Sequence, residues 1–227
     1  MEATRVPSKV KALMSRLQQG SLPGWDAQSL ACPPGRPKDL PERLNAARRA
    51  GVVCLLCPNA QGQWSVVLME RTLDNTPHSG QLAFPGGSEE EVDGGDLVQT
   101  ARREFAEEVG VTLTDDQMLG ELSMLYIPPS NFLVQPVLAW SDVTPEFVLQ
   151  KEEVARVMVV PLAELPQPGA HWPEQWVTVR SGTARVPGWP VGEGVLWGAT
   201  AMMVAELLEV CAGAGFGLSF ASSNDPQ

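Results

Sequence analysis

The sequence predicts an α/β (α+β) fold in which a mixed sheet is packed between helices as an α/β/α sandwich. Two segments, 96–109 and 197–212, have helical character, and short runs with strand character lie before and between them. Strands interleaved with helices in this way are typical of a sheet that is covered on both faces. Hydrophobic residues make up 44% of the chain and charged residues 19%, so its 227 residues suffice for one globular domain with extensions.

The first part of the chain, residues 1–47, is expected to be a helix and an arm that pack on the core. Residues 7–18 have the apolar spacing of a short amphipathic helix. Residues 21–41 are rich in Pro and Gly, which favours a connecting arm over regular structure. Residues 40–50 are predicted to form a second short helix.

The main domain is expected over residues 48–212 and contains the sheet. Residues 51–57 and 64–70 are apolar runs joined by a turn, and they are predicted to be strands. Further strands are predicted at 118–126, 132–140 and 154–160, with a hairpin over 175–179 and 183–186 through Ser181-Gly182. The strongly apolar segment 197–212 is predicted to be a core helix, and residues 213–227 a flexible tail.

Charge and cysteine usage narrow the classes of protein to consider. The formal net charge of −11 argues against nucleic-acid binding, because contacts to a phosphate backbone need Lys and Arg. Cys54 and Cys57 lie three apart in a predicted strand, so their side chains point to opposite faces and do not suit joint ligation of a metal. No apolar run approaches the roughly 18 residues of a membrane span, and free thiols fit a cytoplasmic protein. A homodimer is one candidate for the oligomeric state.

Three glutamates on one predicted helix are the strongest functional signal. Glu104, Glu107 and Glu108 are spaced i, i+3 and i+4, so their carboxylates project from one face. Like charges at this spacing destabilise an isolated helix by about 0.2–0.5 kcal/mol per pair. A hard divalent cation such as Mg²⁺ or Mn²⁺ prefers oxygen ligands of this kind and would offset the repulsion. An ordinary solvated acidic face is the alternative interpretation.

The rest of this helix fits a position between a core and a cleft. Asp96 stands where an N-cap is expected, and Gly110 stands where a helix commonly ends. An apolar stripe on another side of the helix is formed by Val98, Ala101, Phe105 and Val109. The helix can therefore pack on a sheet while its acids point away from the core.

A glycine pair precedes the helix and supports the metal interpretation. Phe84-Pro85-Gly86-Gly87 closes an apolar stretch and opens an acidic loop. Paired glycines allow a sharp turn and a close approach of the backbone, whose carbonyl groups can join carboxylates as metal ligands. A plain turn at the end of a strand is the alternative.

These residues together resemble the Nudix box, which reads Gly-x5-Glu-x7-Arg-Glu-U-x-Glu-Glu-x-Gly-U, with U a bulky aliphatic residue. Gly87 supplies the first glycine, and the run from Arg103 to Val111 matches the second half if Phe105 is accepted as U. Asp93 stands where a Glu is usual, and nine residues instead of seven separate it from Arg103. Three loop acids are candidates for the usual loop role: Glu90, Glu91 and Asp93.

Two further segments are similar to the coenzyme A pyrophosphatase branch of the Nudix hydrolases. One comprises Leu68 to Thr72 together with His78 to Gly87, and the other is Leu196-Trp197-Gly198-Ala199-Thr200-Ala201, which resembles the opening of the last helix in that branch. Branch members often carry an Arg shortly before the His. In this chain Asn75-Thr76-Pro77 occupies that place.

The resemblance implies hydrolysis of a diphosphate linkage in a small nucleoside diphosphate derivative, with coenzyme A or a related species as the expected substrate. It implies Mg²⁺ or Mn²⁺ as cofactor, and four groups as ligands: Glu104, Glu107, Glu108 and the Gly87 carbonyl. Divalent cations would neutralise phosphate charge and lower the pKa of an attacking water.

The resemblance also implies roles for residues around the cation. Glu107 and Glu153 are the candidates for catalytic carboxylates, with Glu153 preferred over its neighbour Glu152, and Arg103 would orient the loop acids. His78 and Phe132 are candidates for substrate binding. A structural hydrogen bond for His78 and plain packing for Phe132 are the alternatives.

Two other functions stay open. One is the same enzyme class acting on ADP-ribose, a dinucleotide or a nucleoside triphosphate. The other is a catalytically silent Nudix-fold module that binds a metabolite or a protein. The intact set of three mutually repelling glutamates argues against the silent module.

Overall fold

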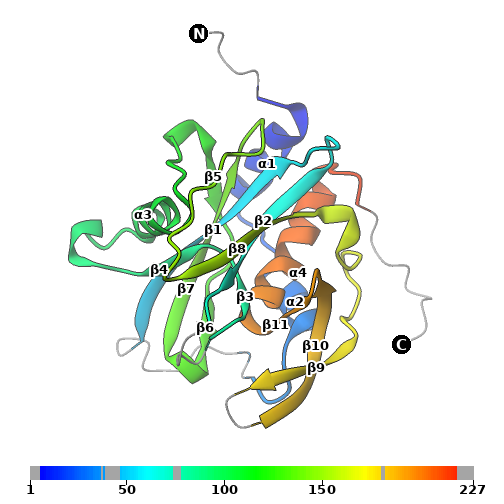
Figure 1. Ribbon diagram of the computed structural model, residues 1–227. Coiled ribbons are helices and arrows are strands. Elements are labelled where there is room, and N and C mark those ends of the chain that lie inside the picture. Colours follow the sequence, from blue (N-terminus) through cyan, green and yellow to red (C-terminus); the bar gives the residue numbers. More distant parts are fainter. Residues whose placement is uncertain (1–5, 37, 39–46, 74–77, 180–181, 219–227) are drawn as a thin grey trace.

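A mixed sheet lies between helices in the computed structural model, which describes residues 6–36, 38, 47–73, 78–179 and 182–218. Helix α3 (Leu97–Val109) covers one face of the sheet, and α1 (Ser8–Gln18), α2 (Trp25–Gln28) and α4 (Gly198–Gly213) lie on the other (Figure 1). This arrangement confirms the predicted α/β/α fold.

Three long strands form the centre of the sheet. Strand β1 (Arg48–Pro58) pairs in parallel with β7 (Phe132–Trp140) and antiparallel with β2 (Trp64–Arg71). Five further strands extend it: β3 (Leu82–Ala83), β4 (Gly86–Ser88), β5 (Met118–Glu121), β6 (Leu125–Ile127) and β8 (Val154–Pro161). The path runs β3-β2-β1-β7-β5, with β4 on β1, β6 on β7 and β8 on β2. The predicted strand 118–126 is therefore two strands, β5 and β6, that pair with different parts of β7.

Alternation along β1 divides the core into two apolar clusters. Val53, Leu55 and Cys57 face α3, whereas Cys54 and Leu56 belong to the cluster that contains α4. The two cysteines thus lie on opposite faces, as the strand period requires, and both are free buried thiols.

A second, three-stranded sheet follows the main one. It consists of β9 (Glu174–Val179), β10 (Gly182–Val191) and β11 (Gly194–Trp197) in the order β11-β10-β9. The predicted hairpin is confirmed, with a longer second strand than expected, although Ser181 lies outside the described residues. This sheet protrudes below α4 in Figure 1.

The N-terminal part is more ordered than the sequence suggests. Helix α1 is confirmed, and it buries Val10 and Leu13. The arm contains α2 and a 3-10 turn, η1 (Ser29–Ala31), which pack against α4. The helix expected over 40–50 is wrong at its end, because residues 48–50 begin β1, where pairing with β4 and β7 outweighs local helix propensity. Residues 40–46 lie outside the described part.

A buried carboxylate joins the arm to α4. Glu206 is fully buried and accepts hydrogen bonds from the backbone N–H of Gly24 (3.2 Å), the backbone N–H of Ser123 (3.2 Å) and Nε2 of Gln28 (2.8 Å). Gln28 Nε2 also donates to the Ser123 carbonyl at 3.3 Å. The arm, the β5–β6 connection and the last helix therefore meet at one side chain.

The end of the described chain packs on the core. Phe216 is buried, and its ring meets that of Trp64 edge-on at 5.1 Å between centroids. The expected flexible tail, residues 213–227, includes this buried ring in its described part, and residues 219–227 lie outside the described range. Among the described residues, no helix is long and apolar enough to cross a membrane.

Candidate active site

Helix α3 has the ends and the orientation that its sequence predicts. The Asp96 side chain caps it by accepting a hydrogen bond from the Val98 N–H at 2.8 Å, and Gly110 ends it in the left-handed region with φ 71°. Ala101, Phe105 and Val109 of the predicted stripe are fully buried against the sheet, and Val98 packs at the edge of this cluster. The helix thereby presents its glutamates to the glycine pair on β4.

Glu108 is the most enclosed of the three glutamates. Its side chain is 2% exposed, and Oε2 accepts a hydrogen bond from the Gly86 N–H at 2.7 Å. Burial raises the pKa of this carboxyl from 4.5 to about 8, while the Gly86 N–H and Arg71 oppose the rise. Arg71 Nη1 lies 3.8 Å from Glu108 Oε1. A buried anion with one long ion pair is a group that a further cation would stabilise.

Glu104 lies against the second glycine. A Cβ atom on Gly87 would sit 2.3 Å from Glu104 Oε2, so a side chain at this position would displace the carboxylate. Burial raises the pKa of Glu104, and the charges of Glu107 and Glu153 add to the rise. The Gly86-Gly87 pair at the start of β4, which is strand and not the expected turn, therefore contacts both Glu108 and Glu104, each through a different glycine.

Arg103 connects the acidic loop to the helix. Its Nε and Nη2 donate to Oδ1 and Oδ2 of Asp93, both at 2.9 Å, and Nη2 also donates to the Ser88 carbonyl at 3.1 Å. Its Nη1 donates to Glu104 Oε1 at 2.9 Å and to Glu107 Oε2 at 3.1 Å. One guanidinium thus holds three carboxylates in fixed positions.

Of the three candidate loop acids, Asp93 is the one that accepts hydrogen bonds from Arg103. It ends a 3-10 turn, η3 (Glu91–Asp93), and its Oδ2 also accepts from the Glu90 N–H and the buried Thr100 hydroxyl, both at 2.9 Å. The Arg103 hydrogen bonds hold the pKa of Asp93 well below its usual range. With all these donors satisfied, Asp93 acts as a fixed brace, whereas Glu90 and Glu91 are exposed.

The remaining predicted carboxylates lie at the open side of the cluster. The Glu107 side chain is 58% exposed. Glu153 is exposed in the loop before β8, and its charge raises the pKa of both Glu104 and Glu108. That loop is tied to the end of α3, because Gln150 N–H donates to the Glu108 carbonyl at 2.9 Å and Glu153 N–H donates to the Gln150 carbonyl at 3.0 Å.

Within the part of the chain that the structure describes, the two residues predicted to bind substrate form no hydrogen bond or ion pair with the carboxylates. His78 lies in the turn before β3, and its Nδ1 is hydrogen-bonded to Gln81 Oε1 at 3.1 Å, the structural alternative considered for it. Phe132 begins β7, and its ring lies under Arg48 at 4.2 Å from the guanidinium carbon. The segment Asn75-Thr76-Pro77 lies outside the described residues.

Arg71 is a site residue that the sequence reasoning missed. It ends β2 beside Glu108, and its Nε atom is buried without a hydrogen-bond partner among the described residues. The sequence signal that could have identified it is its position, because Arg71 directly follows the predicted strand 64–70 and precedes the glycine pair. A ligand oxygen would satisfy the orphaned donor.

The donor groups fit a hard divalent cation in chemistry, although they do not form a closed cage. In the described part of the chain, no three Asp, Glu, His or Cys side chains converge in a metal-binding arrangement, because Arg103 holds Glu104 and Glu107 while Gly86 holds Glu108. The available donors are carboxylate and carbonyl oxygens, which Mg²⁺ and Mn²⁺ prefer. The Gly87 space beside Glu104 also lets a backbone carbonyl approach that carboxylate.

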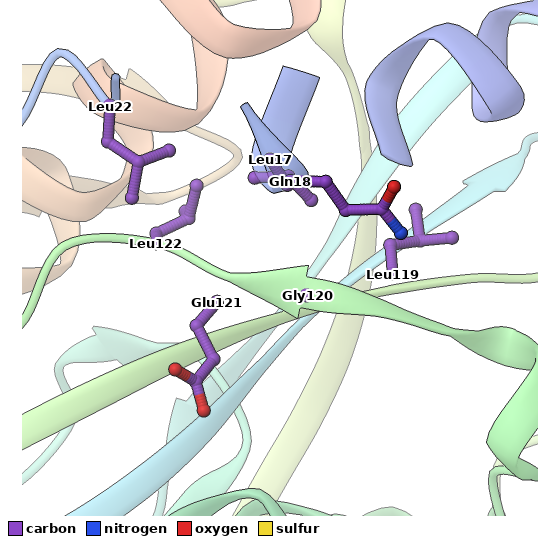
Figure 2. Close-up of a pocket in the computed structure, with 7 residues that line it drawn as sticks. All are labelled: Leu17, Gln18, Leu22, Leu119, Gly120, Glu121 and Leu122. Carbon is purple, nitrogen blue, oxygen red and sulfur yellow. The ribbon is translucent and has the colours of Figure 1, made fainter. Parts of the chain in front are cut away.

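A separate pocket of about 300 Å³ lies between the end of α1 and β5 (Figure 2). Apolar side chains including Leu17, Leu22 and Leu122 line it, and Glu121 contributes a carboxylate. None of the predicted site residues takes part. The proposed chemistry therefore belongs to the open surface around α3 and not to this pocket.

Comparison with known proteins identifies the group to which these features belong. Residues 47–181 match the family model described as NUDIX domain. Peroxisomal coenzyme A diphosphatase ndx-8 of Caenorhabditis elegans is 33% identical over 134 residues, which are 59% of this chain and 57% of that protein. The uncharacterized Nudix hydrolase NudL of Photorhabdus laumondii subsp. laumondii is 30% identical over 172 residues, 74% of this chain and 88% of that protein. The first match thus spans less than two thirds of its relative's length.

A solved structure supports the fold. The crystal structure of a MutT/nudix family protein from Enterococcus faecalis has a TM-score of 0.51 to this chain, covering 93% of this chain and 81% of that chain. At 16% sequence identity this likeness shows the fold alone.

Proposed function

This chain belongs to the NUDIX domain family, and on that premise we propose that it hydrolyses a diphosphate linkage in a nucleoside diphosphate derivative. The observation that carries the proposal is the contact of two helix carboxylates with the glycine pair, Glu108 with Gly86 and Glu104 with Gly87. This contact places two carboxyl groups beside the backbone of β4. A silent binding module has no need of this buried, repelling arrangement.

A divalent cation, Mg²⁺ or Mn²⁺, is part of the proposal. Glu104 and Glu108 would hold it, with Glu107 and the Gly87 carbonyl as further ligands. When bound, the cation supplies charge neutralisation for the diphosphate and a lower pKa for the attacking water. Support comes from the raised pKa of Glu108 and from the oxygen-only donor set.

The side chains around the cation have separate roles in the proposal. Arg103 keeps Glu104 and Glu107 in place through its hydrogen bonds, while Asp93 fixes Arg103 from behind. Glu153 is the proposed base, because it is exposed beside Glu104 and Glu108 and is anchored to the end of α3 through Gln150. Glu107, which is also exposed, is the second candidate for this role.

Arg71 completes the site on the substrate side. Its guanidinium lies next to Glu108, and the unsatisfied Nε is available to an oxygen of the diphosphate. A positive group at this place lowers the repulsion between a polyanionic substrate and a chain with a net charge of −11.

Coenzyme A or a related species is the proposed substrate. The branch resemblance of the segments before Gly87 and after Val195 supports it, as does the similarity to a nematode protein whose name is that of a coenzyme A diphosphatase. ADP-ribose, dinucleotides and nucleoside triphosphates are the competing substrates. His78 and Phe132 stay in the proposal as substrate contacts, to be tested by substitution.

The proposal also covers the location of the protein in the cell, its domain organisation and its partners. Four free cysteines, three of them buried, fit the reducing cytoplasm. Residues 48–212 would form the catalytic domain, with residues 1–47 packed on it. A nucleic-acid partner is not part of the proposal because of the acidic charge, and a homodimer is to be tested by light scattering.

An activity panel tests the function. Coenzyme A, ADP-ribose, a dinucleoside polyphosphate and a nucleoside triphosphate are each incubated with Mg²⁺ or Mn²⁺, and the products are separated by chromatography. We expect cleavage of coenzyme A at the diphosphate and a loss of at least 100-fold in kcat for Glu108→Gln. Glu91→Gln is the matched control, because this exposed loop carboxylate has no side-chain partner among the described residues.

The panel separates the hypotheses by outcome. Absence of cleavage for every diphosphate contradicts the enzyme proposal. Faster cleavage of ADP-ribose than of coenzyme A moves the proposal to that substrate. Full activity of Glu108→Gln contradicts the assignment of the metal ligands.

A further inference from the structure

Arg48 is a cation near the acidic site that has no carboxylate partner among the described residues. The neighbouring arginines are all paired: Arg49 with Glu89, Arg71 with Glu108, Arg102 with Asp115 and Arg103 with Asp93. Arg48 instead donates from Nη2 to the Ser88 hydroxyl at 3.1 Å. Its guanidinium lies over the Phe132 ring.

The position of Arg48 relates it directly to the proposed site. Arg48 begins β1, and Ser88 directly follows Gly87 on β4, the strand that pairs with β1. The Ser88 carbonyl accepts a hydrogen bond from Arg103, which in turn holds Glu104. Three hydrogen bonds, from Arg48 to Ser88, from Arg103 to Ser88 and from Arg103 to Glu104, therefore connect the Arg48 guanidinium to the carboxylate cluster.

Arg48 lies on the face of the sheet opposite α3. Side chains alternate along a strand, and Arg49 is on the α3 side, where Nη2 donates to the Gly95 carbonyl at 3.1 Å. Arg48 shares its face with Ala50, which belongs to the apolar cluster against which Phe132 packs. A molecule bound to the carboxylates can therefore reach Arg48 only by extending past β4 toward the Phe132 side.

The guanidinium is held in place and still has free binding capacity. Stacking on an aromatic ring and one hydrogen bond restrict its motion, so less entropy is lost when a ligand binds. A guanidinium has five N–H donors in a planar fork, and the described contacts of Arg48 use one of them. A planar fork of this kind binds a phosphate through two parallel hydrogen bonds.

We propose that Arg48 binds a second phosphate group of the substrate, separate from the diphosphate that is cleaved, and so selects nucleoside diphosphate derivatives that carry an additional phosphomonoester. The inference rests on the proposed function for the position of the diphosphate. The Phe132 ring stacks on the guanidinium, so a phosphate bound to Arg48 would lie near this ring. Among the candidate substrates, coenzyme A has such a phosphomonoester on its ribose, and ADP-ribose has none.

Paired ligands that differ only in this phosphate test the proposal. The ratio of kcat/KM for coenzyme A over dephospho-coenzyme A is measured for the wild type, Arg48→Gln, Arg48→Lys and the control Arg49→Gln. We expect a wild-type ratio of about ten or more, from the usual strength of charge-assisted hydrogen bonds. The ratio should fall to about one in Arg48→Gln, keep an intermediate value in Arg48→Lys, and stay within twofold of wild type in Arg49→Gln.

A binding measurement separates failure of this inference from failure of the proposed function. Calorimetric titration with adenosine 3′,5′-bisphosphate and with AMP requires no turnover, so it tests Arg48 even if the wild type cleaves neither substrate. We expect the bisphosphate to bind about tenfold more tightly than AMP to the wild type and Arg49→Gln, and equally to Arg48→Gln. The proposal is overturned if the wild type shows no preference or no binding in this titration. It is equally overturned if Arg48→Gln keeps the preference or Arg49→Gln loses it.

Discussion

The neighbouring glycines of β4 should respond in opposite ways to the same substitution. In Gly87→Ala the new methyl group would sit 2.3 Å from Glu104 Oε2, whereas ordinary contact begins at 3.4 Å. The carboxylate must therefore retreat by about 1 Å (3.4 minus 2.3 Å). Because it is the far end of a flexible side chain, the shift should change the free energy of unfolding by no more than about 1 kcal/mol.

The same shift should be damaging to catalysis. A displacement of about 1 Å of a group that holds the reacting centre lowers rates by roughly 100-fold. We therefore expect Gly87→Ala to lose about two orders of magnitude in kcat at saturating Mg²⁺. Its urea midpoint should stay close to that of the wild type.

Gly86→Ala is the matched comparison. Gly86 has φ 150°, and a Cβ atom there would lie 2.3 Å from the Gly51 carbonyl oxygen and 2.5 Å from Val52 Cα. These are backbone atoms of the central strand and cannot move aside, so we expect a loss of about 2–5 kcal/mol in the free energy of unfolding. Wild-type kcat in Gly87→Ala, or equal unfolding of the two variants, would refute the reasoning.

Three other predictions concern stability. Glu108 titrates at a raised pKa of about 8 instead of 4.5, so the metal-free protein should lose stability as pH rises from 4.5 to 8, because the folded state binds the proton more tightly. Glu108→Gln should remove this loss and be about 2–4 kcal/mol more stable than wild type at pH 8.5, with no difference at pH 4, as measured by thermal melts in EDTA. Hydrogen bonds from Arg103 lower the pKa of Asp93 in the folded state. The ionised Asp93 therefore contributes to the free energy of unfolding above the usual aspartate pKa of 3.8, and this contribution is lost as the pH falls below 3.8. Asp93→Asn should therefore cost about 2 kcal/mol at pH 7 and flatten the acid-unfolding curve, and an unchanged curve would contradict the brace role. Glu206→Leu should leave the backbone N–H groups of Gly24 and Ser123 without an acceptor, remove one of the two hydrogen bonds of Gln28 Nε2, and lower the free energy of unfolding by about 3 kcal/mol or more in urea denaturation, whereas Glu164→Leu, at an exposed position, should have little effect.

Features with a local cause could be predicted from the sequence. The limits of α3 follow from Asp96 and Gly110, and its two faces follow from helical periodicity, because caps and periods act within a few residues. The glycine turn could be placed beside the glutamates because the Nudix box carries both. The structure confirms the limits and the two faces of the helix and the position of the glycine pair beside the glutamates, but Gly86 and Gly87 belong to strand β4 and do not form the expected turn.

Features that depend on pairing between distant segments could not be predicted in the same way. Residues 48–50 were expected to be helical, but they are strand because β4 and β7 offer partners that lie about 40 and 85 residues away. The choice of Asp93 among three loop acids depends on the 3-10 turn that carries it to Arg103, and the loop has no periodicity to reveal this turn. The contact between Arg71 and Glu108 joins β2 to α3. These elements are far apart in the sequence, so no short-range pattern predicts that the two side chains are neighbours.

The buried junction at Glu206 has a consequence for synthesis. Its hydrogen bond to Gly24 spans 182 positions of the chain. At translation rates of about 5–20 residues per second, α4 is made roughly 10–40 s after the arm. During this interval the Gly24 N–H and the Gln28 side-chain amide lack the Glu206 carboxylate that accepts their hydrogen bonds in the folded protein. The segment that is made early can therefore be fixed only after α4 has been made, so docking of the arm depends on a contact of high sequence separation.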